Sequence, residues 1–229
     1  MRTLRPSRRT VVRLVLRSVA VAGAVTLTVA LAGQPAQSAF TASTADGGNR
    51  ITAAADFCSS TGGQTLTPTA DVASYESQPG TNFGSHVNLG AISGPTANTR
   101  TFLRFGPLPS VPSGCVLTAT LRLRANSATA GRMIDVYRVD PAATGWTETG
   151  VTWLAMPSGT DPAVGSASLA AAGWQEWTVT SLMPGLYSVN SGFLVRDRTD
   201  SSNPAGSQLY DSRNTATTAN RPQLVLAWS

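Results

Sequence analysis

The chain has 229 residues and a net charge of +5, with 17 Arg and no Lys, a balance common in nucleic-acid-binding proteins. Six Arg residues fall in the first 17 positions, and without residues 1–38 the chain has 11 Arg and 12 acidic residues, a net charge of −1. This near-neutral body excludes sequence-independent binding to nucleic-acid phosphates. One His and two Cys exclude a zinc site built from His and Cys ligands.

The first 38 residues have the pattern of a secretory signal peptide. An Arg-rich segment, residues 1–17, precedes an apolar run of 14 residues from Val19 to Ala32, and small residues follow at Ala36 and Ser38. The run is shorter than the roughly 20 residues that a membrane span requires. We therefore expect a secreted protein without a membrane span, cleaved after Ser38 or Ala39. The general and twin-arginine routes both remain open, and an uncleaved anchor is the alternative.

Export would bring the two cysteines, Cys58 and Cys115, into an oxidising compartment, where they are expected to form a disulfide. The bond would close a loop of 58 residues. Loop entropy then predicts a stabilisation of roughly 4 kcal/mol. Two buried free thiols are the alternative.

Residues 39–63 are expected to form an extended lead-in, and residues 64–229 a single domain of short β-strands. Strand character is clearest in Val116–Arg124, where apolar residues alternate with Thr and Arg. Similar runs lie between turn signals, and Ser166–Ala172 could form a helical turn. The other predicted strands are Gln64–Tyr75, Asn88–Ile92, Arg100–Phe105, Met133–Val139, Trp174–Val179, Gly192–Arg196, Gln208–Tyr210 and Gln223–Trp228. Many short strands at this spacing predict a β-sandwich or barrel.

A set of motifs between residues 65 and 229, taken in chain order, resembles DNRLRE-type domains. The most specific motif is Gly145–Trp153, which reads GWTETGVTW and is followed by Met156-Pro157. The other motifs are Ala70–Ser74, Asn82–Ser85, Asn88–Gly90, Arg100–Phe105, Val116–Arg124, Trp177–Leu182, Gly192–Arg196, Asp211–Arg213 and Asn220–Val225. Thr178 and Asn214 stand where such domains often have acidic residues. Any role that those acids have in the family is therefore not expected in this chain.

The resemblance implies an all-β fold, a jelly-roll-type β-sandwich of two antiparallel sheets in a secreted protein. The chain is similar to carbohydrate-binding module family 96, whose members bind acidic polysaccharides such as alginate. We therefore expect a non-catalytic module for a uronate-containing cell-wall or matrix polysaccharide. The alternatives are a structural cell-surface or matrix protein without a small ligand, and a polysaccharide lyase or hydrolase.

Arginine side chains suit an acidic glycan, because the planar guanidinium group binds a carboxylate through two parallel hydrogen bonds. Arg100 and Arg104 share a face of one predicted strand with Phe102, and Arg122 and Arg124 share a face of another. If the two strands are neighbours with these faces aligned, the four side chains form one cationic platform. Alternatively, each Arg is solvated, paired with an acid, or covers the edge of the core with its alkyl stem.

Aromatic side chains offer flat surfaces on which sugar rings can stack. Trp174 and Trp177 have an odd spacing, so they point to opposite faces of a strand. We expect Trp177 to be buried and Trp174 to be exposed beside Glu176, whereas the two Trp residues of GWTETGVTW fit a structural role. The candidate carbohydrate-binding residues are therefore Arg100, Arg104, Arg122, Arg124, Trp174 and Tyr137.

The sequence indicates no catalytic residue. His86, the single His, lies in a predicted loop, and no Gly-x-Ser-x-Gly motif is present. A lyase could use Tyr137 with Arg138, or Tyr210 with Arg213, for proton transfer. A glycosidase would need two carboxylates about 5–10 Å apart, which the sequence cannot pair.

No cofactor is expected, and the sequence predicts no metal site by ligand spacing. A structural calcium ion is the one exception that stays open. Asp71, Glu76 and Asp211 could provide the oxygen ligands that calcium prefers.

Overall fold

The computed structural model describes residues 58–201 and 205–229. The expected signal peptide (1–38) and most of the expected lead-in (39–63) lie outside the described residues. Within them, strands dominate, and the helical elements are α1 (Met183–Ser188) and the 3-10 turns η1 (Pro141–Ala143), η2 (Thr180–Leu182) and η3 (Thr218–Asn220). The strands are β1 (Gly62–Leu66), β2 (Pro68–Tyr75), β3 (Asn88–Ser93), β4 (Thr99–Phe105), β5 (Leu117–Ala128), β6 (Met133–Val139), β7 (Gly159–Ala167), β8 (Gly173–Thr178), β9 (Phe193–Asp197), β10 (Gly206–Asp211) and β11 (Gln223–Trp228).

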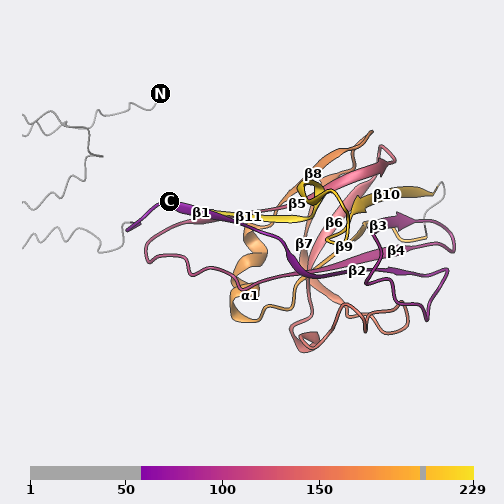
Figure 1. Cartoon of the computed structure of the whole chain (residues 1–229), viewed down its shortest axis with the longest axis horizontal. Helices are drawn as coiled ribbons and strands as arrows, with labels where there is room; N and C mark the ends of the chain where they lie inside the picture. The colour runs from indigo at the N-terminus through magenta and orange to yellow at the C-terminus, as the bar shows by residue number, and fades with distance from the viewer. Residues whose placement is uncertain (1–57, 202–204) are drawn as a thin grey trace, which may run out of the picture. The chain divides into compact units, whose positions relative to one another are not determined.

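The strands pair antiparallel in two groups (Figure 1). One group runs β2-β4-β9-β6-β7; the other runs β1-β11-β5-β10-β3 and has β8 paired with β5. A single residue pair, Ile92 with Thr99, joins β3 to β4 and makes the two groups one curled, 11-stranded sheet. The all-β prediction is confirmed, and the jelly-roll order of its connections stays a prediction.

The main hydrophobic core takes side chains from both groups of strands. Leu121 and Leu123 of β5 are fully buried, as are Ile134 and Val136 of β6. Trp177 of β8 is buried as predicted, and its Nε1 donates to the carbonyl oxygen of Ile134 over 2.9 Å. Because this bond connects β8 to β6, the inner faces of the two groups pack against the same core.

Two local predictions differ from the structure, and the short helix α1 was not predicted. The run Gln64–Tyr75 is two strands, because Pro68 lacks an N–H donor and the chain changes partner there, from β11 to β4. The run Ser166–Ala172 contains no helical turn, since its first two residues end β7. Helix α1 has six residues, too few for a helical period to stand out in the sequence. No helix of the described residues has the length and apolar character for crossing a membrane.

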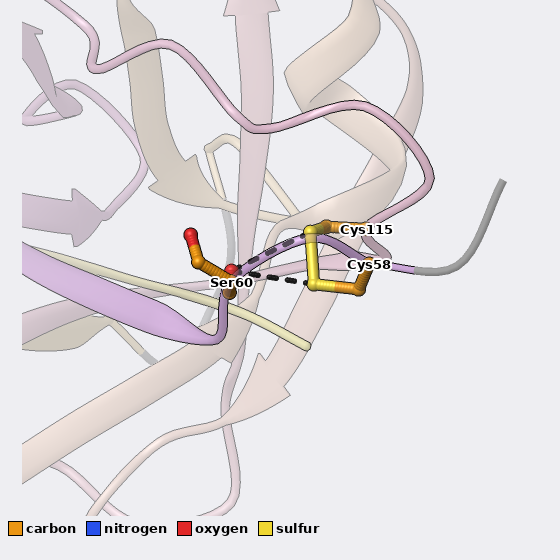
Figure 2. Close-up of a disulfide and its surroundings, with 3 residues drawn as sticks. All are labelled: Cys58, Ser60 and Cys115. Atoms are coloured by element: carbon orange, nitrogen blue, oxygen red, sulfur yellow. Dashed lines mark hydrogen bonds between the residues drawn. A yellow bond between two sulfur atoms is a disulfide. The ribbon is translucent and has the colours of Figure 1, made fainter. Parts of the chain in front are cut away.

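The predicted disulfide between Cys58 and Cys115 is confirmed (Figure 2). It links the segment before β1 to the segment before β5, and both sulfur atoms lie near the Ser60 carbonyl oxygen, at 3.3 and 3.6 Å. The first four residues of β1 are exposed, so this strand buries little apolar surface of its own. The disulfide therefore holds an edge strand that side-chain packing fixes only weakly.

Candidate functional site

The four predicted arginines lie in two places. Arg100 and Arg104 alternate on β4 with core residues, and Arg122 and Arg124 alternate in the same way on β5. Both pairs therefore point away from the main core. However, β4 pairs with β2, β3 and β9, whereas β5 pairs with β8, β10 and β11. The structure does not bring the four arginines together on one platform.

We call the outer surface of β4, β9 and β6 the arginine face; it carries Arg100, Arg104 and Arg196. Each of these guanidinium groups lies over an aromatic ring, an arrangement that favours cation–π attraction. The pairs, with the distance from the Arg Cζ atom to the ring centroid, are Arg100 with Trp153 at 4.8 Å, Arg104 with Trp146 at 4.4 Å, and Arg196 with Tyr137 at 4.9 Å. Stacking on rings holds these long side chains in place.

A covering loop, residues 140–158, connects β6 to β7 and supplies the two tryptophans. Its Trp146 and Val151 are buried in a second, smaller hydrophobic cluster with Phe102 of the arginine face and Val72 of β2. The Trp146 Nε1 donates to the carbonyl oxygen of Ser191 over 2.8 Å. Trp146 is therefore part of the packing that fixes the loop, as its motif predicted.

Glu148 of the covering loop is held by an ion pair with Arg213, whose Nη2 lies 2.9 Å from Oε2. The backbone N–H of Arg213 also donates to Oδ2 of Asp71 over 2.6 Å. Asp71 is almost completely buried, and its Oδ1 has no hydrogen-bond partner among the described residues. Burial, which outweighs the hydrogen bond from Arg213, raises the pKa of Asp71 to about 7.

A pocket of about 180 Å³ opens on the arginine face next to the covering loop. Gly159 lies against Tyr137, and a Cβ atom at this position would be 2.8 Å from the Tyr137 Cβ atom. A glycine here therefore leaves room for the tyrosine side chain. The lining residues are Arg100, Tyr137, Ser158, Gly159, Leu194 and Arg196.

The two arginines of this pocket converge on one acid, Asp200. Its Oδ2 lies 2.5 Å from Arg100 Nη2 and 3.4 Å from Arg196 Nη1, while Arg196 Nη2 donates to the Tyr137 hydroxyl oxygen over 3.1 Å. Burial lowers the pKa of Arg196, but the hydrogen bond to Tyr137 and the nearby carboxylates outweigh it, so the pKa is raised. The Nε atoms of both arginines are buried and have no partner among the residues the structure describes.

The outer face of the other strand group, which we call the β5 face, is arranged differently. Arg122 lies over the Trp174 ring at 4.6 Å, and its Nε pairs with Glu176 Oε1 at 2.6 Å. Its Nη1 also donates to Gln223 Oε1, and Arg124 donates to the carbonyl oxygen of its neighbour Ala125. These arginines thus have partners on their own strand, β5, or on the adjacent strands β8 and β11.

Arg196 and Asp200 were not among the sequence candidates. Arg196 ends the predicted strand Gly192–Arg196, but only the pairing of β9 with β4 and β6 places it between Arg100 and Tyr137. Asp200 lies in the stretch Asp197–Ala219, whose low content of apolar residues predicts a surface loop with one short strand. The spacing of Leu194 and Arg196 indicates that both side chains point to the same face of the strand. No signal in the sequence shows which residues of other strands lie next to Arg196.

Other candidate chemistry is dispersed. His86 is exposed on a loop, and Tyr210 is fully buried with its hydroxyl donating to Gln175 Oε1. Across residues 58–201 and 205–229, no three His, Cys, Asp or Glu side chains are grouped to hold a metal ion. The three acids named for calcium have separate partners: Asp71 accepts from Arg213, Glu76 from Asn98, and Asp211 from Asn126.

A larger pocket, of about 460 Å³, lies near α1. Leu117, Met183 and Tyr187 are among its lining residues, and no charged side chain lines it. A pocket of about 380 Å³ in the covering loop, whose lining includes Trp146 and Met156, also has no charged side chain in its lining. An acidic sugar polymer calls for cations, and of these three pockets only that of the arginine face is lined by them, so we take it as the candidate site.

Comparison with known proteins places the described domain in one family. The sequence model of Carbohydrate-binding module family 96 matches residues 63–227, which is well over half of the chain and includes every strand except the first residue of β1 and the last residue of β11. No curated protein matches the chain.

Proposed function

The chain belongs to carbohydrate-binding module family 96, and from this premise we propose that it is an exported, non-catalytic module that holds an acidic, uronate-containing polysaccharide at the pocket of the arginine face. Cations, an aromatic ring and a hollow occur together in this pocket. Arg100 and Arg196 supply the cations, and Tyr137 supplies the ring.

The observation that carries the proposal is the convergence of Arg100 and Arg196 on a single carboxylate, that of Asp200. A carboxylate therefore fits between these two guanidinium groups in this fold. Each group is also oriented by an aromatic ring, so less side-chain freedom is lost when a ligand binds. A uronate residue offers the same carboxylate on a sugar ring.

The pocket favours binding over catalysis. Among the described residues, Asp200 is the one acid paired with its two arginines, and no second carboxylate lines the pocket, so it offers no pair of acids for glycoside hydrolysis. Tyr137 is the lining residue considered above for proton transfer in a lyase, and its hydroxyl accepts a hydrogen bond from Arg196. Tyr137 with Arg138 and Tyr210 with Arg213 were the two pairs considered for a lyase. Tyr210 is fully buried, so a polymer cannot reach the second pair.

Export is supported by the leader pattern of residues 1–38 and by the disulfide between Cys58 and Cys115. Disulfides persist in oxidising compartments. Sequencing the N-terminus of the protein recovered from a culture medium tests this part. A mature chain beginning at Ala39 or Phe40 is expected, and an intact Met1 would contradict cleavage.

Affinity electrophoresis of the full chain tests the ligand class. Gels containing alginate or polygalacturonate should retard the protein, and gels containing a neutral glucan or the same polymers after reduction of their carboxyl groups should not. The substitution Arg196→Gln should weaken binding about tenfold or more, because it removes a charge-assisted hydrogen bond to the ligand. The matched control is Arg122→Gln on the β5 face, which should bind as the wild type does.

Four outcomes would each contradict part of the proposal. Equal retardation by neutral and acidic polymers would exclude selectivity for uronates, and no retardation by any glycan would favour a structural role. Release of unsaturated sugar ends from alginate would contradict the non-catalytic assignment. An Arg122→Gln variant weakened as strongly as Arg196→Gln would move the site to the other face.

A further inference from the structure

We propose that the Asp200 carboxylate occupies the position of a ligand carboxylate between Arg100 and Arg196, and that an acidic glycan binds by displacing it. Asp200 would then determine both the affinity and the selectivity of the site. This inference rests on the proposed function and adds a residue to it. It concerns the free state of the same pocket, where the protein supplies its own anion.

The contacts of Asp200 are those expected of a bound anion. A single oxygen, Oδ2, contacts both guanidinium groups, and the three side chains are between 22 and 29% exposed. Partly exposed ion pairs of this kind are weak enough to exchange with a competing carboxylate.

The backbone on both sides of Asp200 is fixed, so exchange requires only the side chain to turn away. The N–H of Thr199 donates to Asp197 Oδ1 over 2.9 Å, and the N–H of Ser201 donates to Asn98 Oδ1 over 2.8 Å. Asn98 is buried. These bonds place the Asp200 carboxylate at the arginines without any hydrogen bond from the backbone to that carboxylate among the described residues.

Displacement explains how the site could reject neutral sugars. A neutral sugar that took the place of Asp200 would separate two arginines from their counter-ion and offer no charge in return. A uronate replaces one carboxylate with another, and the number of ion pairs is preserved. The internal carboxylate lowers the apparent affinity for every ligand by the fraction of the time it occupies the site.

The test compares Asp200→Asn with Asp211→Asn, a variant with the same charge change on β10 in the other strand group. Binding of the full chain to alginate is measured by affinity electrophoresis, with the melting temperature of each variant. Asp200→Asn should bind alginate about fivefold more tightly than the wild type, and Asp211→Asn should stay within about twofold of it. Asp200→Asn should also gain binding to the carboxyl-reduced polymer, because its arginines are no longer paired.

A second measurement uses the wild-type chain and does not depend on how a variant folds. The side-chain carboxyl carbon of Asp200 is followed by NMR in the labelled full chain during titration with a uronate oligosaccharide. A change in its chemical shift that parallels binding is expected. Binding without such a change, or weaker binding by a folded Asp200→Asn variant, would overturn the displacement and leave the uronate site intact. Wild-type protein that binds no uronate would overturn the proposed function itself.

Discussion

On β4, Arg100 and Arg104 point away from the main core, and on β5, Arg122 and Arg124 do the same. The two faces nevertheless differ. On the arginine face, Arg100 meets Arg196 from the neighbouring part of the sheet, and both converge on an acid from a loop. On the β5 face, the arginines are matched by groups on their own or adjacent strands.

The covering loop explains much of this difference. Residues 140–158 place two tryptophans over the arginine face and border a pocket there. On the β5 face, Thr118 and Thr178 of β5 and β8 are exposed. The comparison teaches that arginine spacing on a strand does not create a binding site. A site arises where a loop and a neighbouring strand hold the arginines around a hollow.

The largest expected effect is on stability, and it comes from removing the disulfide beside β1 and β5. Replacing both Cys58 and Cys115 with Ser should lower the free energy of unfolding by about 4 kcal/mol, because the unfolded chain loses the loop closure. Affinity for alginate should remain within about twofold, because the disulfide lies beside β1 and β5, away from the strands of the arginine face. Urea unfolding and affinity electrophoresis measure the two effects. If the double variant folds but does not bind alginate, the binding site on the arginine face depends on the disulfide in the other strand group.

A second prediction concerns the attachment of the covering loop through Asp71 and Arg213. Since burial raises the pKa of Asp71 to about 7, the folded chain binds a proton more strongly than the unfolded chain. This contribution to stability is complete below the ordinary carboxyl pKa of about 4 and is lost as the pH rises through 7. The stability of the wild type, minus that of Asp71→Asn, should therefore fall by about 3 kcal/mol between pH 4 and pH 7.

Urea unfolding at a series of pH values measures this difference. Asparagine has nearly the volume of aspartate and can still accept the hydrogen bond from the Arg213 backbone. A difference that stays flat, or that rises with pH, would mean that Asp71 is ionised in the folded chain. Alginate affinity measured at the same pH values shows whether the loop attachment also affects the pocket.

Filling the pocket floor should have a smaller effect. In Gly159→Ala, the new Cβ would lie 2.8 Å from Tyr137 Cβ and 3.0 Å from Leu194 Cδ2, so the tyrosine must move. We expect a loss of alginate affinity of about threefold to tenfold and a destabilisation of about 1 kcal/mol. Gly145→Ala in the covering loop is the matched control, because its added methyl group would meet no atom within 4 Å beyond its own chain neighbours. Equal affinities for the two variants would remove Tyr137 from the site.

The sequence indicated part of this arrangement. Alternation in Val116–Arg124 correctly separated buried from outward-facing residues. The odd spacing of Trp174 and Trp177 correctly put them on opposite faces, and Trp177, in register with Val179, is buried as predicted. Trp174 was expected to be exposed but is half-buried, because Arg122 lies over its ring. The two cysteines indicated their own pairing. These are local properties, because a period of two depends only on the geometry of one strand.

The rest of the site depends on pairing between segments that are distant in the sequence. Arg100 and Arg196 meet because Thr101 pairs with Val195, a register that neither strand specifies alone. β7 also escaped prediction, since its sequence GTDPAVGSA lacks apolar alternation. Asp200 lies in a loop whose path is set by hydrogen bonds to Asn98 and Asp197.

The smallest expected effect tests whether the β5 face is as unspecialised as its contacts indicate. Arg122 and Glu176 are paired with side chains 30 and 51% exposed, so a double-mutant cycle with Arg122→Gln and Glu176→Gln should give a coupling of about 0.5 kcal/mol. The coupling should weaken further in about 1 M salt, because exposed charges are screened. Trp174→Leu should bind alginate as the wild type does. A coupling above about 1.5 kcal/mol, or an affinity loss in Trp174→Leu, would mean that the β5 face is also organised to bind a ligand and that the covering loop is not required for it.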